Sequence, residues 1–195
     1  MSDRPVPTAA VLHPKALDAF GRQVRRIAPH QWTAPTPCAG WSVHDLVNHL
    51  TAEQLWVPEL LMGSTAADVG GRFDGNVLDD DPVAFWQAAA DAAGEAFGVP
   101  GALDVTVHLP GGDLGASDYC ARLTADAVVH TWDLARGIGA DPGLSDELTD
   151  FALTELAGYG DDLATSGLFG PPVATSGTAG PLTRLLGLTG RRAGT

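Results

Sequence analysis

Apolar residues recur at three- and four-residue spacing in five stretches of the chain, which is the pattern of amphipathic α-helices. In the first stretch, the apolar side chains that would share one helix face are Leu17, Phe20, Val24 and Ile27. Together with start and stop signals, the spacing predicts helices over residues 14–27, 42–62, 82–97, 116–136 and 145–163. A shorter helical piece is expected near the end of the chain, over residues 182–188.

Capping and turn residues define several of these boundaries. Ser42 is suited to the N-cap of the second helix, and Asp45 three residues later completes a capping box with a shorter acid than usual. Pro82 fits the first position of the third helix, because a backbone N–H would be unpaired there in any case. Gly137 or Gly139 would end the fourth helix.

One segment breaks the helical pattern. The run ALDVTVHL over residues 102–109 has the composition of a short strand, and the glycine-rich PGGDLG after it predicts a turn. Since helices dominate, the predicted fold class is all-α: a four-helix bundle with a long second-to-third helix connection and at most one short strand pair. The bundle is expected over residues 1–165, with a C-terminal tail, residues 166–195, packed on it.

Composition narrows the function classes. The formal net charge is −13, whereas nucleic acids and anionic membranes are bound by concentrated Lys and Arg, so neither partner is expected. No secretory signal is recognised, and the uncharged run 163–183 is too rich in Gly and Pro for a membrane helix. The two cysteines are too few for a disulfide scaffold. A cytoplasmic protein with a small-molecule substrate or thiol as its partner is predicted, and the oligomeric state stays open, with a homodimer as one option.

Histidine spacing identifies the candidate chemistry, because neutral imidazole is a common metal ligand. On a helix, an acid four residues before a histidine lies on the same face and can share a metal ion with it. Three of the six histidines have this spacing, in the pairs Asp45–His49, Asp104–His108 and Asp126–His130. Residues four apart in a strand are separated by about 13 Å, which excludes the pair Asp104–His108, and Asp45 already has a capping role.

Asp126 and His130 lie in the middle of a predicted helix, in an apolar setting where an acid is costly unless it is paired or binds a metal. With His49 they form the predicted metal-ligand set. Glu53, one turn after His49, is expected to support a ligand or accept a proton, and Asp133 is expected to orient His130 or replace a ligand. The alternatives are structural: an i,i+4 hydrogen-bonded pair for Asp126 and His130, and a core histidine for His49.

The other chemistry-bearing side chains are expected to have structural roles. The histidines predicted at the surface or at helix caps are His13, His30 and His44. Cys120 is predicted to be a buried thiol, and Cys38 lies in a loop where the sequence offers no base to activate it. The tryptophans expected in the bundle core are Trp41, Trp56, Trp86 and Trp132.

Several segments resemble a known family. TPCAGWSVHDLVNHLTAEQLW and ADAVVHTWDLARGIG are similar to two signatures of the mycothiol-dependent maleylpyruvate isomerase N-terminal domain family, within the wider DinB-like superfamily. The closing segments FGPPV and PLTRLLGLTGRR resemble the end of stand-alone actinobacterial members. The resemblance implies a DinB-like four-helix bundle with one divalent metal, Zn²⁺ first and Ni²⁺ as the alternative, held by His49, Asp126 and His130. The isomerase has a longer Glu where this chain has Asp126, so the alternative carboxylate ligands are Glu53, Asp133 and Asp45.

The resemblance also implies mycothiol as a thiol cofactor. The leading hypothesis is therefore a metal-dependent thiol transferase or isomerase-like enzyme that uses mycothiol. A metal-dependent hydrolase that uses water is the first alternative. A non-catalytic bundle that binds a small ligand or a partner is the second.

Overall fold

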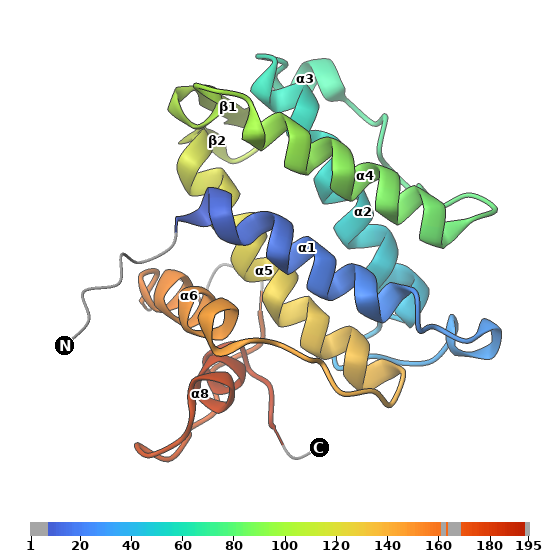
Figure 1. The fold of residues 1–195 in the computed structure, drawn as a ribbon, viewed down its shortest axis with the longest axis vertical. Coiled ribbons are helices and arrows are strands. Elements are labelled where there is room, and N and C mark those ends of the chain that lie inside the picture. Colours follow the sequence, from blue (N-terminus) through green and yellow to red (C-terminus); the bar gives the residue numbers. More distant parts are fainter. Residues whose placement is uncertain (1–7, 161–162, 164–168, 194–195) are drawn as a thin grey trace.

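The computed structural model describes residues 8–160, 163 and 169–193, and this part of the chain is mostly helical (Figure 1). Its four long helices are α1 (Ala9–Val24), α2 (Val43–Leu61), α4 (Pro82–Gly98) and α5 (Ala116–Gly137). Helix α1 packs against α4 and α5, and α2 packs against the same two helices. The four helices therefore form a bundle, which confirms the predicted all-α architecture.

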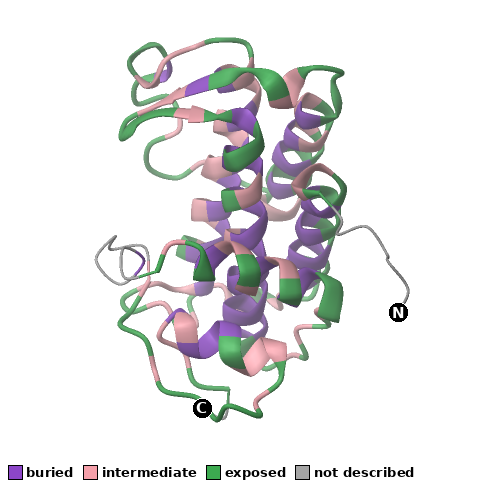
Figure 2. Cartoon of the chain, turned by 90° about the vertical axis from the view of Figure 1, so that its left-hand side faces the viewer, coloured by how far each residue is buried: buried purple, intermediate pink, exposed green. Residues whose placement is uncertain are grey.

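The core lies where the inward faces of these helices meet. Figure 2 shows buried residues along the inner sides of the long helices and exposed residues on their outer sides. The largest fully buried side chains include Trp86, Phe20, Leu12, Leu46 and Leu50. Of the tryptophans predicted in the core, Trp86 and Trp132 are buried, whereas Trp41 and Trp56 are only half-buried.

The first helix begins earlier than predicted. Helix α1 starts at Ala9, and Pro14 lies inside it although proline cannot donate the hydrogen bond of a helix interior. The additional residues place Leu12 and His13 in the core, where both are 0% exposed. The predicted surface or capping role of His13 is therefore wrong.

Two helices end earlier than predicted. Helix α1 ends at Val24 rather than at residue 27, and Ala28, the residue before Pro29, is extended. Helix α6 (Asp146–Ala157) stops six residues before the predicted end at 163. Gly160 follows with a positive φ of 54°, a conformation that continues no right-handed helix.

Helix α2 begins with the predicted capping box. Asp45 Oδ2 accepts hydrogen bonds from Ser42 N at 2.9 Å and from Ser42 Oγ at 2.6 Å, and Asp45 N donates to Ser42 Oγ at 3.2 Å. These bonds satisfy donors that the first helical turn leaves unpaired. The cap fixes the start of the helix that carries His49 and Glu53, and it engages the exposed Asp45.

A small antiparallel sheet lies at one end of the bundle (Figure 1). Strand β1 (Thr106–Leu109) pairs with β2 (Gly112–Gly115), which confirms the short strand pair. The strand begins later than residue 102, because Ala102–Asp104 form a 3-10 turn. His108 Nδ1 lies 2.7 Å from Asp113 Oδ1 across the hairpin, so the acid that His108 contacts is Asp113.

The connection between α2 and α4 is long, as predicted, and contains a short helix that the apolar spacing did not predict. Helix α3 (Ala66–Val69) begins with a capping box formed by Thr65 and Asp68. Asn48 of α2 anchors the later part of the connection, where its Nδ2 donates to the carbonyl of Gly75 at 2.8 Å. This anchor ties the connection to the helix that carries His49.

The C-terminal segment returns to the bundle. Helix α8 (Pro181–Leu188), predicted over 182–188, packs against α6, which in turn packs on α5. The boundary predicted between bundle and tail, at residues 165 and 166, lies outside the described residues. The division into bundle and tail therefore stays a prediction.

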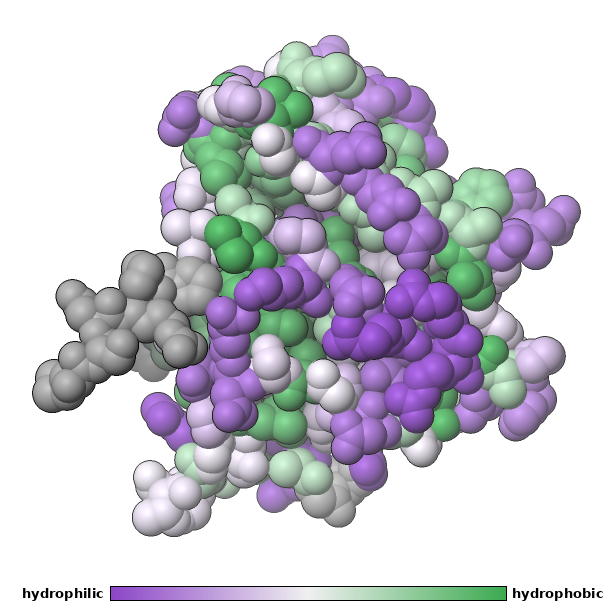
Figure 3. All heavy atoms as spheres, in the orientation of Figure 1, coloured by the Kyte–Doolittle hydropathy of each residue, from purple (hydrophilic) through white to green (hydrophobic). Residues whose placement is uncertain are grey.

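The outer surface has mixed polarity. Figure 3 shows hydrophilic side chains gathered over α1 and along α4, with apolar patches between them. The large hydrophobic side chains that are exposed are Val11, Met62, Phe85, Val99 and Val105. Within the described residues, no helix combines the length and the apolar character that crossing a membrane requires.

Candidate metal centre

The three predicted ligands meet between two helices. His49 belongs to α2, and Asp126 and His130 belong to α5, one helical turn apart. His49 Nε2 lies 3.9 Å from Asp126 Oδ2, and His130 Nε2 lies 3.5 Å from Asp126 Oδ1. One donor atom of each residue lies within 4.8 Å of the other two. The i,i+4 spacing and the packing of α2 on α5 together produce this convergence.

Asp133 holds His130 from the other edge of the ring. Asp133 Oδ2 accepts a hydrogen bond from His130 Nδ1 at 2.9 Å, because a carboxylate can only accept. His130 is 5% exposed and Asp133 is 0% exposed. The ring nitrogen left for a ligand is then Nε2, which faces Asp126. Hydrogen bonds of this kind orient histidines that bind metals.

Arg191 ties the C-terminal segment to the same carboxylate. Arg191 Nε donates to Asp133 Oδ1 at 3.0 Å, and Nη2 donates to Asp133 Oδ2 at 2.6 Å. A bidentate pair of this type is stronger than a single hydrogen bond and fixes both partners. Arg191 Nη1 also donates to the carbonyl of Thr189 at 2.7 Å. A residue 58 positions after Asp133 thus becomes part of the site.

Charges shift the protonation of the buried groups. Burial disfavours the charged form of Asp133, but its hydrogen bonds to His130 and Arg191 lower the pKa of this carboxyl. Burial also disfavours the charged form of His130, yet the nearby carboxylates of Asp126 and Asp133 raise its pKa well above the ordinary value. Burial lowers the pKa of His49. Burial therefore favours the neutral form of His49, whereas the neighbouring carboxylates favour a proton or another cation at His130.

Glu53 adds a carboxylate one turn after His49. Glu53 Oε1 lies 3.6 Å from His49 Nε2. Burial and the charge of Asp126 raise the pKa of Glu53 well above the ordinary value. Glu53 Oε2 and Asp126 Oδ2 are buried and have no hydrogen-bond partner in the described part of the chain. Each unpaired buried group costs about 1–3 kcal/mol, and a cation bound between the carboxylates would satisfy both.

These side chains line a cavity of about 530 Å³. Trp41, in the loop before α2, forms part of the wall, with its ring centroid 4.8 Å from that of His49. Phe169, from the C-terminal segment, forms another part, 6.4 Å from the ring of His130. A cavity of this size is within the range of small-molecule sites. Trp41, predicted in the bundle core, therefore belongs to the wall of the site.

Cys38, His130 and Asp133 form a second group whose donor atoms lie within 4.8 Å of one another. The thiol of Cys38 donates to Asp133 Oδ2 at 3.3 Å and lies 3.7 Å from His130 Nδ1. Arg191 places a guanidinium in this group, with Nη2 3.7 Å from Cys38 Sγ. A fixed positive charge disfavours a bound cation here. The candidate metal centre is therefore the group of His49, Asp126 and His130.

All five residues that the sequence singled out lie together: the predicted ligands His49, Asp126 and His130, and the supporting acids Glu53 and Asp133. Their roles as ligands and supporting groups stay predictions. Cys38 and Arg191 also line the cavity, and the histidine spacing did not identify them. The only sequence signal for either is that Cys38 lies in the segment TPCAGW and Arg191 in the closing PLTRLLGLTGRR.

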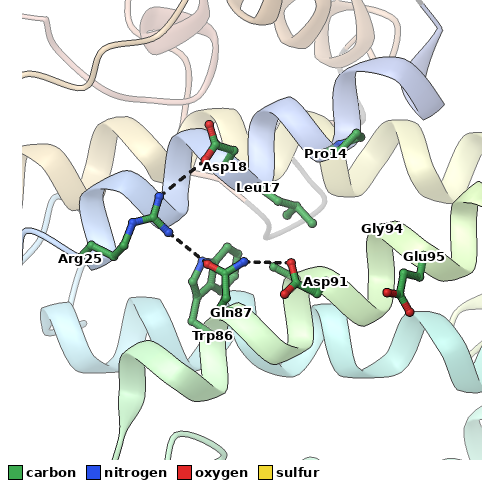
Figure 4. A pocket seen from close by; sticks show the side chains of 10 residues that line it. Pro14, Leu17, Asp18, Arg25, Trp86, Gln87, Asp91, Gly94 and Glu95 are labelled. Atoms are coloured by element: carbon green, nitrogen blue, oxygen red, sulfur yellow. Dashed lines mark hydrogen bonds and ion pairs between the residues drawn. The ribbon is translucent and has the colours of Figure 1, made fainter.

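A smaller cavity of about 330 Å³ lies between α1 and α4 (Figure 4). Its polar side chains contact one another: Arg25 Nη1 donates to Gln87 Oε1 at 3.0 Å, and Gln87 Nε2 donates to Asp91 Oδ1 at 2.9 Å. None of the predicted site residues lines it. The chemistry-bearing residues are therefore concentrated in the larger cavity.

Comparisons with known proteins identify the family of this chain. Residues 13–135 match the family described as mycothiol maleylpyruvate isomerase N-terminal domain. Two uncharacterised proteins of Mycobacterium tuberculosis, from strains CDC 1551 and H37Rv, are each 33% identical over 136 residues, which cover 70% of this chain and 70% of each relative. No solved structure gives a significant match. The matched region contains the three predicted ligands and most of the four long helices, and the chain belongs to the mycothiol maleylpyruvate isomerase N-terminal domain family.

Proposed function

We propose that this protein is a divalent-metal-dependent enzyme that uses mycothiol in a thiol-transfer or isomerase-like reaction. One observation carries the proposal: His49, Asp126 and His130 present donor atoms within 4.8 Å of one another on the wall of a cavity. The family supports the choice of mycothiol as the thiol. The proposed compartment is the cytoplasm, where small thiols are kept reduced.

The residues fit a catalytic metal site. Two imidazoles and one carboxylate are a donor set of catalytic zinc centres, which keep a further position open. Asp126 Oδ2, buried without a hydrogen-bond partner in the described residues, is suited to a cation. Zn²⁺ is the first candidate, and Ni²⁺ is the alternative because imidazole suits both metals.

A divalent metal, when bound, supplies a positive charge that favours the thiolate form of a thiol and polarises a carbonyl. The residues of the chain set the geometry around it. Asp133 fixes the ring of His130, so Nε2 stays directed toward Asp126. Glu53 is positioned to hold or release a proton at its buried Oε2, next to the reacting groups. Trp41 packs against the ring of His49 and Phe169 against the ring of His130, so both contribute apolar wall next to the candidate ligands.

Metal analysis tests the site assignment first. The protein is purified without a polyhistidine tag, and metal content and thermal stability are measured with added Zn²⁺ or Ni²⁺, because binding to the native state raises the melting temperature. We expect stoichiometric metal in the wild type and its loss in His49→Ala and His130→Ala. His108→Ala is the matched control, because His108 also contacts an acid but lies in the exposed hairpin. Full metal content in both site variants would contradict the assignment.

The reaction is tested with metal-loaded protein, mycothiol and an electrophilic acceptor. We expect thiol consumption that requires both metal and mycothiol and that disappears in His49→Ala and His130→Ala.

The position of Glu53, 3.6 Å from His49, also favours a second candidate, hydrolysis with Glu53 as the base for water. Turnover of an ester without thiol would support hydrolysis. If the wild type binds no metal, the remaining hypothesis is a non-catalytic bundle that binds a small ligand or a partner.

A further inference from the structure

The smaller cavity, between α1 and α4, is separate from the candidate metal centre. Its volume is about 330 Å³, and it shares no lining residue with the larger cavity. Its floor is apolar, because it is lined by the buried side chains of Leu17 from α1 and of Trp86 and Ala90 from α4. The volume lies at the lower end of the range for small-molecule sites. The proposed function gives this cavity no role.

Trp86 brings an unpaired donor to the cavity. Its side chain is only 1% exposed, and its indole N–H donates to no acceptor among the described residues. A buried tryptophan N–H usually has a hydrogen-bond partner. The nitrogen is still reachable from the cavity that Trp86 lines. A ligand in the cavity can therefore supply the acceptor.

Gly21 of α1 leaves space next to this donor. A Cβ at Gly21 would lie 2.9 Å from Trp86 Nε1 and 3.3 Å from Arg25 Nη1. Glycine weakens a helix interior relative to alanine, but here the missing Cβ leaves the indole N–H and a guanidinium close to each other. Arg25 Nη1 donates to Gln87 Oε1 at 3.0 Å, and the guanidinium keeps further N–H donors. A carboxylate is the acceptor that best suits a guanidinium together with a second N–H.

The other end of the cavity is acidic. Asp91 and Glu95 lie one turn apart on α4, and Asp91 Oδ1 accepts a hydrogen bond from Gln87 Nε2 at 2.9 Å. Within the part of the chain that the structure describes, no Lys, Arg or His pairs with either carboxylate. Figure 4 shows Arg25 at one end of the cavity and Glu95 at the other. Since a helix rises about 1.5 Å per residue, roughly 7 Å along α4 separates Trp86 from Asp91.

We propose that the smaller cavity binds a small zwitterion whose carboxylate and ammonium are separated by several bonds, as in an ω-amino acid. The carboxylate accepts hydrogen bonds from Trp86 Nε1 and Arg25. The aliphatic chain lies over Leu17, and the ammonium donates to the carboxylates of Asp91 and Glu95. A ligand with only a carboxylate is repelled by the acidic end, and a ligand with only an ammonium leaves the indole N–H unpaired. The charges of a zwitterion match both ends of the cavity.

The test uses the full chain and 6-aminohexanoate as the probe, with titration calorimetry and NMR of the tryptophan indole N–H groups. We expect saturable binding and a shift of the indole resonance of Trp86. Hexanoate and hexylamine each carry one of the two charged groups, so each should bind at least about fivefold more weakly. No binding of 6-aminohexanoate, or binding that leaves the Trp86 resonance in place, would overturn the proposal. Hexylamine or hexanoate of equal affinity would overturn the zwitterion as the ligand.

Two variants test the two ends of the cavity. The double variant Asp91→Asn, Glu95→Gln changes only exposed side chains, so it should fold, and it should bind 6-aminohexanoate at least about fivefold more weakly. Gly21→Ala places a methyl group against Trp86 Nε1 and should abolish the indole shift. Wild-type binding in either variant would contradict the site.

Matched controls accompany both variants. Asp150→Asn changes an exposed acid outside the cavity, and Gly98→Ala adds a Cβ that meets nothing within 4 Å. Both should bind 6-aminohexanoate like the wild type. Metal-free His49→Ala should do the same, because His49 lines only the larger of these two cavities. Loss of binding in His49→Ala would mean that the probe occupies the candidate metal centre, and the assignment to the smaller cavity would be wrong.

Discussion

The buried carboxylate of Asp133 accepts a hydrogen bond from His130 Nδ1 at 2.9 Å. The same carboxylate binds the guanidinium of Arg191 at 2.6 and 3.0 Å. The orientation of His130 therefore depends on a chain of contacts that ends in the C-terminal segment, and not on α5 alone. Because metal binding requires a fixed ring orientation, this chain of contacts should control metal affinity.

Replacing Asp133 with Asn tests this relationship. The amide keeps the size of the side chain but removes the charge and can present a donor to His130 Nδ1, which disfavours the tautomer that leaves Nε2 free. We expect Asp133→Asn to weaken zinc binding by about 10- to 100-fold, measured by competition with a chromogenic chelator. The control is Asp113→Asn, which removes the exposed partner of His108 and should leave zinc affinity unchanged. Equal affinities of Asp133→Asn and wild type would show that Asp133 does not orient a ligand.

Variants of Asp126 test the carboxylate ligand. Asp126→Asn removes the charge from a group whose Oδ2 is buried without a hydrogen-bond partner in the described residues, and we expect zinc affinity to fall by more than about tenfold. Asp126→Glu introduces the longer acid that the family resemblance implies, so metal binding should be retained. Isothermal titration calorimetry distinguishes the two, with exposed Asp150→Asn as the control. Loss of binding in Asp126→Glu but not in Asp126→Asn would exclude a ligand role.

Local signals were sufficient to predict the helices that carry the candidate site. Apolar spacing located α2 and α5, the Ser42 cap fixed the start of α2, and the i,i+4 spacing placed Asp126 beside His130. Each of these signals lies within a few residues of the feature it predicts. The approach of His49 to the other two predicted ligands is a tertiary contact, and the family resemblance implies it where the spacing alone leaves structural alternatives.

The parts that were wrong or missing depend on contacts distant in sequence. No periodic pattern links Arg191 to Asp133, 58 residues earlier, because their contact depends on how the C-terminal segment returns to α5. The predicted helix begins at residue 14, which places His13 at its edge and outside the core. Its burial depends on packing against Thr124 of α5 and Phe97 of α4.

Gly190 should be required for the position of the C-terminal segment. Its φ is 81°, and a Cβ there would lie 2.8–2.9 Å from backbone atoms of Gly170, which cannot move as a flexible side chain can. We expect Gly190→Ala to destabilise the protein by about 1–3 kcal/mol in urea unfolding and to weaken zinc binding by displacing Arg191. Gly177→Ala is the matched control, because a Cβ at Gly177 meets nothing within 4 Å. Equal stability of Gly190→Ala and wild type would refute the close backbone crossing.

His13 should make the stability of the bundle depend on pH. Burial lowers the pKa of His13 from 6.5 to about 4. Its Nδ1 donates to Thr124 Oγ1 at 3.1 Å, and a side-chain contact with Gln54 offsets only part of the lowering of the pKa. As the pH falls below about 6.5, His13 becomes protonated in the unfolded chain but stays neutral in the folded chain. The free energy of unfolding should therefore decrease by about 3 kcal/mol as the pH falls from about 6.5 to about 4, the pKa of His13 in the folded protein.

The variant His13→Gln isolates this contribution, because other acidic groups also titrate in the same range. Gln can keep a donor toward Thr124 but does not bind a proton. Urea unfolding is measured at about pH 7.5 and at about pH 4.5 for both proteins, and the loss of stability between them should be about 2–3 kcal/mol smaller in His13→Gln. His30→Gln, at an exposed position, should lose as much stability as the wild type. If His13→Gln and wild type lose the same stability, the buried ring accepts a proton without cost, and the polar contacts of His13 must then differ from those in the structure.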